Sequence, residues 1–360
     1  MQQNLISRSL LLLLVAGSLV LTACKKDDDD KKTDPAPTPT TYEFSDYEAN
    51  TTNSRELGTR LAALTTEMQK GRNVANTLTA QQLLALYQGV GNTLGYNTES
   101  QFAAKTVGWL VNLADQTGKA FNPANPTTGG VFGGYLFDEK GVELEQLVEK
   151  GSFGSLLFYR ALTDHLTKET LTVADIDNAF AYYGAQPKFP NNNTDRFGAR
   201  YAARRDNGGH YRRLRDQFLA ARAAVAAGNQ TAAKNAVAII REEWEKALGA
   251  TIINYLYASA EKFPSSADAD KASALHAWGE GVGFIYGLRA IPENLRILKN
   301  SKIEYVLELM KAEDGQQAPL DFKTPADIAE LTKAIQELAE AYGFADPTIY
   351  KINDVTANGR

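Results

Sequence analysis

Residues 272–288 (ASALHAWGEGVGFIYGL) place large apolar side chains on almost every side of the helix that their spacing predicts. A helix of this composition must be enclosed by other elements, because an exposed face would leave much apolar area in water. The segment therefore predicts a central helix in the core of a multi-helix fold. No other segment of the chain constrains the architecture as strongly.

The only charged or readily charged side chains of this segment are His276 and Glu280. On a helical wheel they share a face about 100° wide with Gly279, Gly283 and Gly287. Each glycine costs about 1 kcal/mol in a helix interior relative to alanine, so a stripe of them needs a physical reason. The sequence predicts that a second backbone, or a bound ligand, approaches this face closely.

A buried imidazole and a buried carboxylate need partners, because an uncompensated buried charge costs several kcal/mol. In one interpretation His276 and Glu280 pair with each other, or Glu280 pairs with a Lys or Arg of a neighbouring helix. In the other, His276 and Glu280 hold an iron species or another divalent metal together with groups from other helices. The expected further contributors to such a binding site are Glu143, Glu145, Lys150, Gly279 and Gly283.

The rest of the mature chain is predicted to be helical almost throughout, because apolar residues recur at helical spacing and strand-like alternation is nearly absent. We expect an all-α fold of about eleven helices, bundled in two halves. The expected helices are 53–70, 79–86, 98–118, 138–150, 152–166, 173–183, 210–227, 230–262, 265–291, 301–311 and 325–343. Proline and asparagine in 187–193 predict a boundary between an N-terminal half (42–186) and a C-terminal half (187–345), with a tail at 346–360.

The N-terminus has the pattern of an export signal. Arg8 precedes an apolar run at 10–21, which ends in Leu-Thr-Ala-Cys at 21–24. These four residues resemble the lipobox of bacterial lipoproteins, and Cys24 is the only cysteine of the chain. We therefore expect a signal peptide at 1–23, lipidation of Cys24, and a disordered Pro-rich linker over 24–41.

Lysine and aspartate directly after Cys24 resemble the surface-export signal of Bacteroidetes lipoproteins. The resemblance implies a protein anchored in the outer membrane through Cys24 and exposed at the cell surface. The alternative is a solvated spacer that leaves the protein facing the periplasm. A formal net charge of −5 argues against nucleic acid as the main partner, since that would need a concentrated basic face.

Residues 195–216 hold seven arginines against three aspartates. Guanidinium groups match carboxylates and phosphates, so that Arg204 and Arg205 are candidate ligands for an anion. The alternative is a connector whose arginines pair with carboxylates of the protein itself. The three tryptophans fall on apolar helical stripes, which favours the core over a sugar-stacking surface.

Several short strings resemble a Bacteroidetes lipoprotein family known as DUF4856, and more loosely the imelysin-like proteins. They are KGVE at 140–143, QLVEKG at 146–151, AFAYYG at 179–184, HAWGE at 276–280 and FIYGL at 284–288. Imelysin-like proteins carry Gly-x-His-x-x-Glu; here Ala274 replaces the glycine, and Glu280 follows His276 by four residues. The resemblance implies a two-lobed helical bundle of the bacterial envelope that is associated with iron acquisition.

These observations favour a surface-anchored, non-enzymatic lipoprotein that binds a small ligand, such as an iron species, where its two halves meet. An outer-membrane uptake complex is the expected partner. The alternative is a glycan-binding protein, or a subunit of an outer-membrane complex, that uses an aromatic or arginine-rich face. A hydrolase ranks last, because the sequence contains no His-Glu-x-x-His motif and no phosphate-binding loop.

Overall fold

The helical periodicity of the sequence appears as thirteen α-helices in the part of the chain that the computed structural model describes, residues 39–188 and 194–354. About two-thirds of the chain is helical, so the protein is all-α, as predicted. The predicted signal peptide, Cys24 and nearly all of the predicted linker lie outside the described residues. Most of the predicted boundary at 187–193 and the end of the predicted tail also lie outside them. None of the described helices combines the length and the hydrophobicity needed to cross a bilayer.

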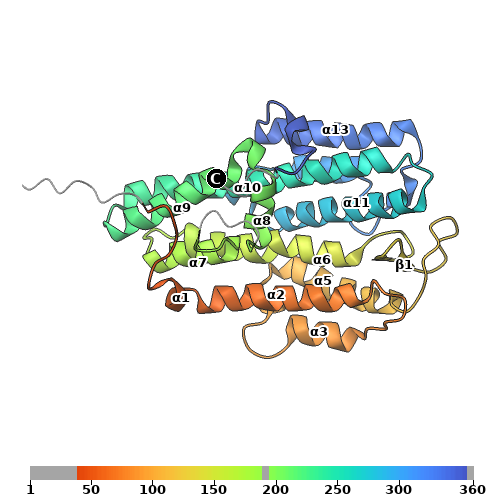
Figure 1. Ribbon diagram of the computed structural model, residues 1–360, viewed down its shortest axis with the longest axis horizontal. Helices are drawn as coiled ribbons and strands as arrows, with labels where there is room; N and C mark the ends of the chain where they lie inside the picture. The colour runs from red at the N-terminus through yellow and green to blue at the C-terminus, as the bar shows by residue number, and fades with distance from the viewer. Residues whose placement is uncertain (1–38, 189–193, 355–360) are drawn as a thin grey trace, which may run out of the picture. The chain divides into compact units, whose positions relative to one another are not determined.

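The helices follow one another in two groups that pack side by side (Figure 1). The first group comprises α1 (Tyr47–Asn50), α2 (Thr52–Lys70), α3 (Ala80–Gln88), α4 (Leu94–Asn97), α5 (Ser100–Gln116), α6 (Leu144–Ser152) and α7 (Val173–Tyr183). The second comprises α8 (Phe197–Arg204), α9 (His210–Ala226), α10 (Gln230–Lys262), α11 (Asp268–Arg289), α12 (Asn300–Leu309) and α13 (Pro325–Tyr342). The two groups meet where α6 packs along α11, and residues 39–188 and 194–354 belong to one compact unit.

Residues 122–134, which lie between two predicted helices, contain part of an antiparallel hairpin. Strand β1 (Gly130–Phe132) pairs with β2 (Tyr135–Phe137). The turn between them is Gly133-Gly134, and both residues have positive φ, at 59° and 86°. Two-residue hairpin loops need such backbone angles, which glycine adopts without steric cost.

The helix predicted to begin at residue 138 begins instead at Leu144. Asp138 accepts hydrogen bonds from the backbone N–H groups of Lys140 and Val142, and Gly141 has a φ of 83°. This side-chain cap offers the backbone an alternative to a helical turn. The prediction failed here because spacing alone does not reveal that competition.

The helix predicted at 152–166 is helical but mostly of the wider π type. It continues from α6 as η1 (Phe153–Phe158) and η2 (Ala161–Leu166). Such segments are rare and often occur at functional sites. Helix α8 was not predicted, because its arginines resembled a connector; α1 and α4 are single turns of four residues.

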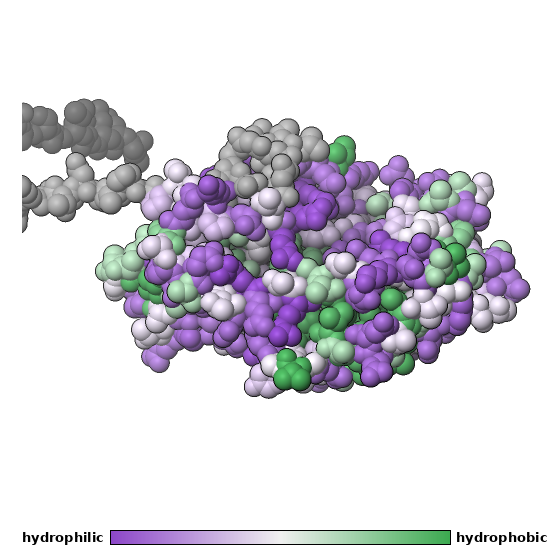
Figure 2. Space-filling view, turned by 60° about the horizontal axis from the view of Figure 1, so that its bottom comes forward, coloured by the Kyte–Doolittle hydropathy of each residue, from purple (hydrophilic) through white to green (hydrophobic). Residues whose placement is uncertain are grey.

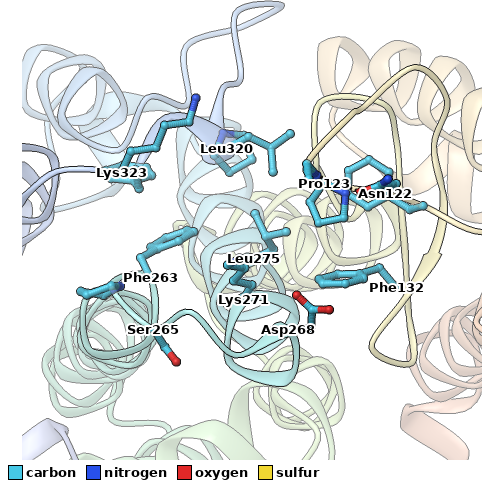
Figure 3. A pocket seen from close by; sticks show the side chains of 15 residues that line it. Asn122, Pro123, Phe132, Phe263, Ser265, Asp268, Lys271, Leu275, Leu320 and Lys323 are labelled. Atoms are coloured by element: carbon cyan, nitrogen blue, oxygen red, sulfur yellow. Dashed lines mark hydrogen bonds between the residues drawn. The ribbon is translucent and has the colours of Figure 1, made fainter.

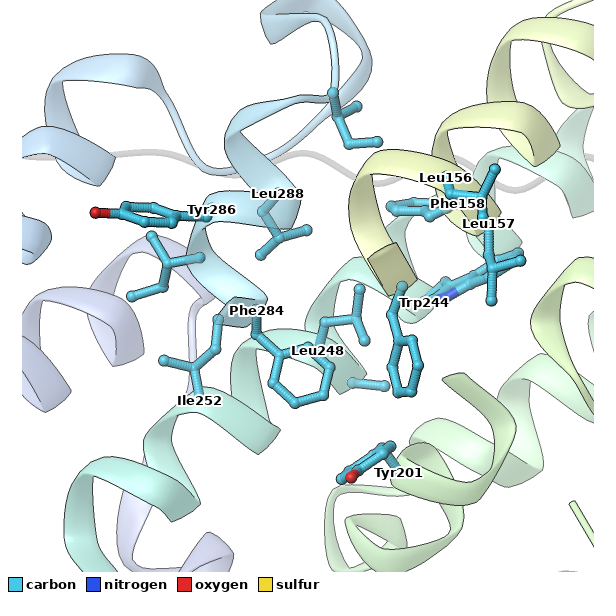
Figure 4. Close-up of a cluster of buried hydrophobic side chains, with 14 of the residues drawn as sticks. Leu156, Leu157, Phe158, Tyr201, Trp244, Leu248, Ile252, Phe284, Tyr286 and Leu288 are labelled. Carbon is cyan, nitrogen blue, oxygen red and sulfur yellow. The ribbon is translucent and has the colours of Figure 1, made fainter. Parts of the chain in front are cut away.

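Helix α11 is enclosed, as its composition predicted. It packs against α6, η1, α10 and α12. Figure 4 shows its Phe284 beside Leu248 of α10, in a cluster of buried side chains that also contains Leu288 and Trp244. The indole N–H of Trp278 donates to the carbonyl of Met310 at 2.8 Å. Trp244 and Trp278 therefore belong to the core, as predicted.

The surface accordingly keeps few large apolar side chains. Figure 2 shows one face that is largely hydrophilic, with hydrophobic residues gathered toward its lower edge. Among the described residues, the exposed large apolar side chains are Val74, Val90, Tyr96, Val111, Ile239, Ile349 and Ile352.

The glycines of α11 let two backbones touch. A Cβ atom on Gly283 would lie 2.4 Å from the carbonyl oxygen of Gln146, and one on Gly287 would lie 2.4 Å from that of Gly151. A Cβ atom on Gly154 would in turn lie 2.3 Å from the carbonyl carbon of Gly287. Of the two causes that the sequence allowed for this stripe, the approach of another backbone is present.

We predict that Gly283→Ala destabilises the protein by about 1–3 kcal/mol, because the new methyl group overlaps a backbone atom and α6 must move. The matched control is Gly281→Ala on the same helix, where a Cβ would make an ordinary 3.6 Å contact with Met310. Helix propensity should leave that variant as stable as the wild type, or more stable by up to about 1 kcal/mol. Denaturant unfolding gives both values, and equal losses would contradict the explanation.

Candidate functional site

His276 lies at the contact between α11 and α6. Its Nδ1 is 2.6 Å from Oε2 of Glu143, and its Nε2 is 3.4 Å from Oε2 of Glu280. The ring of Tyr135, from the hairpin, stacks on the imidazole with centroids 4.1 Å apart and planes 16° apart. The imidazole is therefore held between two carboxylates and covered on one face by an aromatic ring.

Arg72, just after α2, connects two buried carboxylates of the same cluster. Its Nη2 is 2.9 Å from Oε1 of Glu143, and its Nε is 2.7 Å from Oε2 of Glu145. The guanidinium also lies over the Tyr135 ring, 5.2 Å from its centroid. Sequence reasoning missed Arg72, because nothing distinguishes it locally from the other basic residues at helix ends.

Glu280 has a second set of partners on its other side. Its Oε1 accepts a hydrogen bond from the Tyr255 hydroxyl at 2.9 Å and lies 3.4 Å from Nζ of Lys150. Lys150 also donates to Glu149 at 2.7 Å and lies over the ring of Tyr201. The interpretation that Glu280 pairs internally is confirmed by these contacts.

The structure thus brings together all five charged or titratable residues predicted for this site, His276, Glu280, Glu143, Glu145 and Lys150, and adds Arg72, Tyr135 and Tyr255. Of the two predicted glycines, Gly283 meets the α6 backbone, whereas a Cβ on Gly279 would find its nearest neighbours 3.6 Å away. We call the eight residues other than the glycines the α6–α11 charge cluster: His276, Glu280, Glu143, Glu145, Lys150, Arg72, Tyr135 and Tyr255.

The surroundings shift the pKa values of the charge cluster. Burial opposes the imidazolium of His276, but the charge and hydrogen bond of Glu143, together with Glu280, raise its pKa above the ordinary value of 6.5. Burial and the neighbouring Glu143 raise the pKa of Glu145 to about 7, against the pull of Arg72. For Lys150, burial is outweighed by Glu149, Tyr201 and Glu280, so its pKa is raised well above the usual range.

Among residues 39–188 and 194–354, no three His, Cys, Asp or Glu side chains are arranged to hold a metal ion. In the charge cluster, the guanidinium of Arg72 and the ammonium of Lys150 already neutralise the carboxylates that would ligate one. The metal site at His276 and Glu280 stays a prediction, and this geometry favours the internal pairing.

The arginine-rich segment 195–216 is bound largely into the protein. Arg205 is 1% exposed and donates to the side-chain oxygens of Asn254 and Asn353, at 2.7 and 2.5 Å. Burial lowers its pKa to about 10. Arg204 is half-buried over the ring of Tyr201. Other arginines of the segment pair with carboxylates, in Arg212–Asp206, Arg213–Glu243 and Arg215–Asp216.

A cavity of about 610 Å³ opens one residue away from His276, where Leu275 of α11 points into it (Figure 3). We call it the α10–α11 pocket. Its lining comes from both halves of the chain: the loop before the hairpin, β1, the α10–α11 turn and the region of η5 (Pro319–Asp321). The apolar lining residues are Phe121, Pro123, Ala124, Phe132, Phe263, Pro264, Leu275, Pro319, Leu320 and Phe322.

The charged groups of this pocket stand among the apolar ones. Lys271 and Lys323 stand at two sides of the pocket, with Asp268 between Lys271 and the hairpin (Figure 3). The ammonium of Lys323 is exposed and lies 3.1 Å from Oδ1 of Asp321. The pocket therefore offers an apolar floor and two ammonium groups, an arrangement that the sequence did not reveal because four separate segments build it.

Comparisons with known proteins give one match. Residues 174–345 match the family described as "Domain of unknown function (DUF4856)", which supports the relation to that family. The match runs from α7 through α13 and contains all of α11, while α6 lies outside it. It indicates no catalytic activity. Neither the curated proteins nor the solved structures include one that matches this chain.

We predict that Arg72→Met destabilises the protein by about 3–5 kcal/mol, because it leaves two buried carboxylates without their counter-charge. The control is Arg60→Met on α2, which removes a pair with the partly exposed Glu56 and should cost less than about 1 kcal/mol. Chemical denaturation measures both. A loss for Arg72→Met no larger than that of the control would show that the cluster contributes little to stability.

We predict that stability falls as the pH rises above about 6.5, because His276 binds its proton more tightly in the folded protein. Its contribution is fully present below the unfolded pKa and is lost as the pH passes through the raised folded pKa. The raised pKa of Glu145 acts in the same direction. In His276→Gln the fall in unfolding free energy should be shallower, and an unchanged slope would argue against the assignment.

Proposed function

We propose that this protein is a non-enzymatic binding protein that takes up a small amphipathic anion in the α10–α11 pocket, where the two halves of the chain meet. The observation that carries the proposal is the lining: ten apolar residues together with Lys271 and Lys323. Ligand pockets in proteins are typically concave and mostly apolar, with a few polar groups that orient the ligand.

The chemistry of the lining defines the ligand class. An apolar body would displace water from Phe132, Phe263 and Leu275 and gain about 25 cal/mol for each Å² of apolar area buried. An acid group on the ligand would pair with Lys271 or Lys323 at the rim. A neutral hydrocarbon would leave the ammonium groups unused, and a cation would meet two like charges against the single carboxylate of Asp268.

The place of the charge cluster supports the same proposal. Leu275 and His276 are neighbours on α11, so one side chain faces the pocket and the other is held by Glu143. Tyr135 and Phe132 lie on opposite strands of one hairpin, and the first covers His276 while the second lines the pocket. The charge cluster would thereby fix both α11 and the hairpin, which form two walls of the binding site.

The location in the cell belongs to the proposal and rests on the sequence alone. Lipidation of Cys24 would tether the protein to the outer membrane, with the linker placing the folded unit at the cell surface. An outer-membrane uptake complex would then be the natural recipient of the ligand. The acidic net charge agrees with a partner other than nucleic acid.

An iron species remains a ligand to be tested, either as a bare ion or as an anionic chelate. To bind a bare ion, the carboxylates of the charge cluster would have to release Arg72 and Lys150 and ligate the metal instead. An anionic chelate could pair with the lysines of the α10–α11 pocket. We expect ferrous, ferric and zinc ions alone to leave the melting temperature unchanged. Stabilisation by an ion that disappears in Glu280→Gln would favour the metal site instead.

We predict that decanoate binds the soluble protein from Tyr42 onward more tightly than decanol, and that decylammonium binds least. Because the three share a chain length, the differences isolate the head-group charge. In Lys271→Gln/Lys323→Gln the preference of decanoate over decanol should largely disappear. Isothermal titration calorimetry measures all three.

The matched control is Lys234→Gln, which removes an exposed lysine of α10 that does not line the pocket. It should keep the wild-type preference. Failure of decanoate to bind, or an equal loss of preference in the control, would refute the proposal.

A further inference from the structure

A second, polar pocket lies on the N-terminal group of helices. It has a volume of about 360 Å³ and is bounded by α1 and α2, the loop before α4, η2 and α7. We call it the asparagine pocket. Its lining residues are Ala49, Asn50, Thr52, Asn53, Leu57, Asn92, Asn97, Asp164, His165, Asn178 and Tyr182.

Three groups of this lining, from three different elements, have no hydrogen-bond partner among the described residues. They are the carboxamide of Asn53, Nε2 of His165 and the hydroxyl of Tyr182. The Tyr182 side chain is only 5% exposed and lines the cavity, so the ring is held by its surroundings. The rings of His165 and Tyr182 are neighbours, with centroids 6.0 Å apart.

The walls that carry these groups are held in place by hydrogen bonds within the protein. Asn178 donates to the backbone carbonyls of Asn50 and Ala174, at 2.9 and 2.8 Å. Asn97 donates to Oδ1 of Asn92 at 2.7 Å. Because these bonds fix the wall, the positions of the free groups are set before any ligand binds.

The ring of His165 is also held in place by a contact with another side chain. Its Nδ1 is 3.0 Å from Oδ1 of Asp175, a carboxylate that does not line the pocket. The nitrogen that remains is Nε2, which in the neutral ring accepts a hydrogen bond when Nδ1 carries the proton. His165 lies in the π-helical segment η2, a type of helix that often occurs at functional sites.

The charge of the lining excludes several ligand classes. No Lys or Arg lines the pocket, so nothing would offset the charge of a phosphate or a carboxylate. The one carboxylate, Asp164, is already bonded to Thr163 at 2.9 Å and to Arg160 at 3.2 Å. Ala49 and Leu57 are the only aliphatic residues of the lining, which gives an apolar ligand little to bury against.

We propose that the asparagine pocket binds a neutral carbohydrate, one sugar ring at a time. A sugar hydroxyl both donates and accepts, and the free groups offer both functions: the amide of Asn53 and the hydroxyl of Tyr182 can do either, and Nε2 of His165 accepts. The site is separate from the α10–α11 pocket and takes a ligand of different chemistry.

The test is saturation-transfer NMR and calorimetry on the soluble protein with glucose, galactose and mannose. Glucose 6-phosphate and glucosamine serve as the anionic and cationic probes. We expect at least one neutral sugar to bind, and the phosphate to bind more weakly than its parent. Tyr182→Phe removes one hydroxyl and keeps the ring, and it should weaken the binding of that sugar about 3–10-fold. Asn53→Ala, on the exposed surface of α2, should weaken the binding to a similar extent.

Two comparisons separate this proposal from the one for the α10–α11 pocket. The variant Lys271→Gln/Lys323→Gln should bind the sugar as the wild type does, and Tyr182→Phe should bind decanoate normally. No binding of any neutral sugar at millimolar concentration would overturn the proposal. So would tighter binding of the phosphate, or wild-type affinity in both Tyr182→Phe and Asn53→Ala when circular dichroism shows them folded.

Discussion

The close contact between the backbones of α6–η1 and α11 is the constraint on which the rest of the structure depends. Gly283, Gly287 and Gly154 carry no side chains into this contact, and carbonyl groups of the opposite helix occupy the space where side chains would stand. Because the backbones are so close, the polar residues at the end of the contact have little room to rearrange. His276 meets Glu143 there, and the two groups of helices are joined at the same place.

The charge cluster adds specificity to this contact more than it adds stability. Burying three carboxylates, an ammonium and an imidazole carries a desolvation cost that their mutual attraction only partly offsets. The observed packing gives each charge its partner, and Arg72, Glu143, Tyr255 and Glu280 come from different segments. A shifted register would leave a charge unpaired at a cost of several kcal/mol. The cluster therefore selects one packing, and the neighbouring α10–α11 pocket takes its shape from that packing.

Long helices with a clear stripe were predictable almost to the residue. Gln230–Lys262 and Val173–Tyr183 have the predicted bounds, because Asn229 and Thr172 cap their starts, and Pro264 and Gly184 mark their ends. The hairpin, the late start of α6 and the π-helical segments were not predicted. Each has a local cause that helical spacing does not reveal. The hairpin depends on two glycines with positive φ, and the late start of α6 depends on the side chain of Asp138. The π-helical segments have wider turns that leave the apolar spacing nearly unchanged.

From the sequence alone it follows that residues 272–288 form a buried helix and that His276 and Glu280 need partners, because composition and helical geometry are local properties. The sequence also led us to expect Glu143, Glu145 and Lys150 as contributors to the same site. The partners of His276 and Glu280 come from segments far apart in the chain, and so do Arg72 and Tyr135, which complete the cluster. No local sequence pattern shows that these segments meet. Both pockets belong to this second kind, since each is bounded by at least four separate segments. A cavity is a property of how elements pack, and only the tertiary structure decides where packing leaves space.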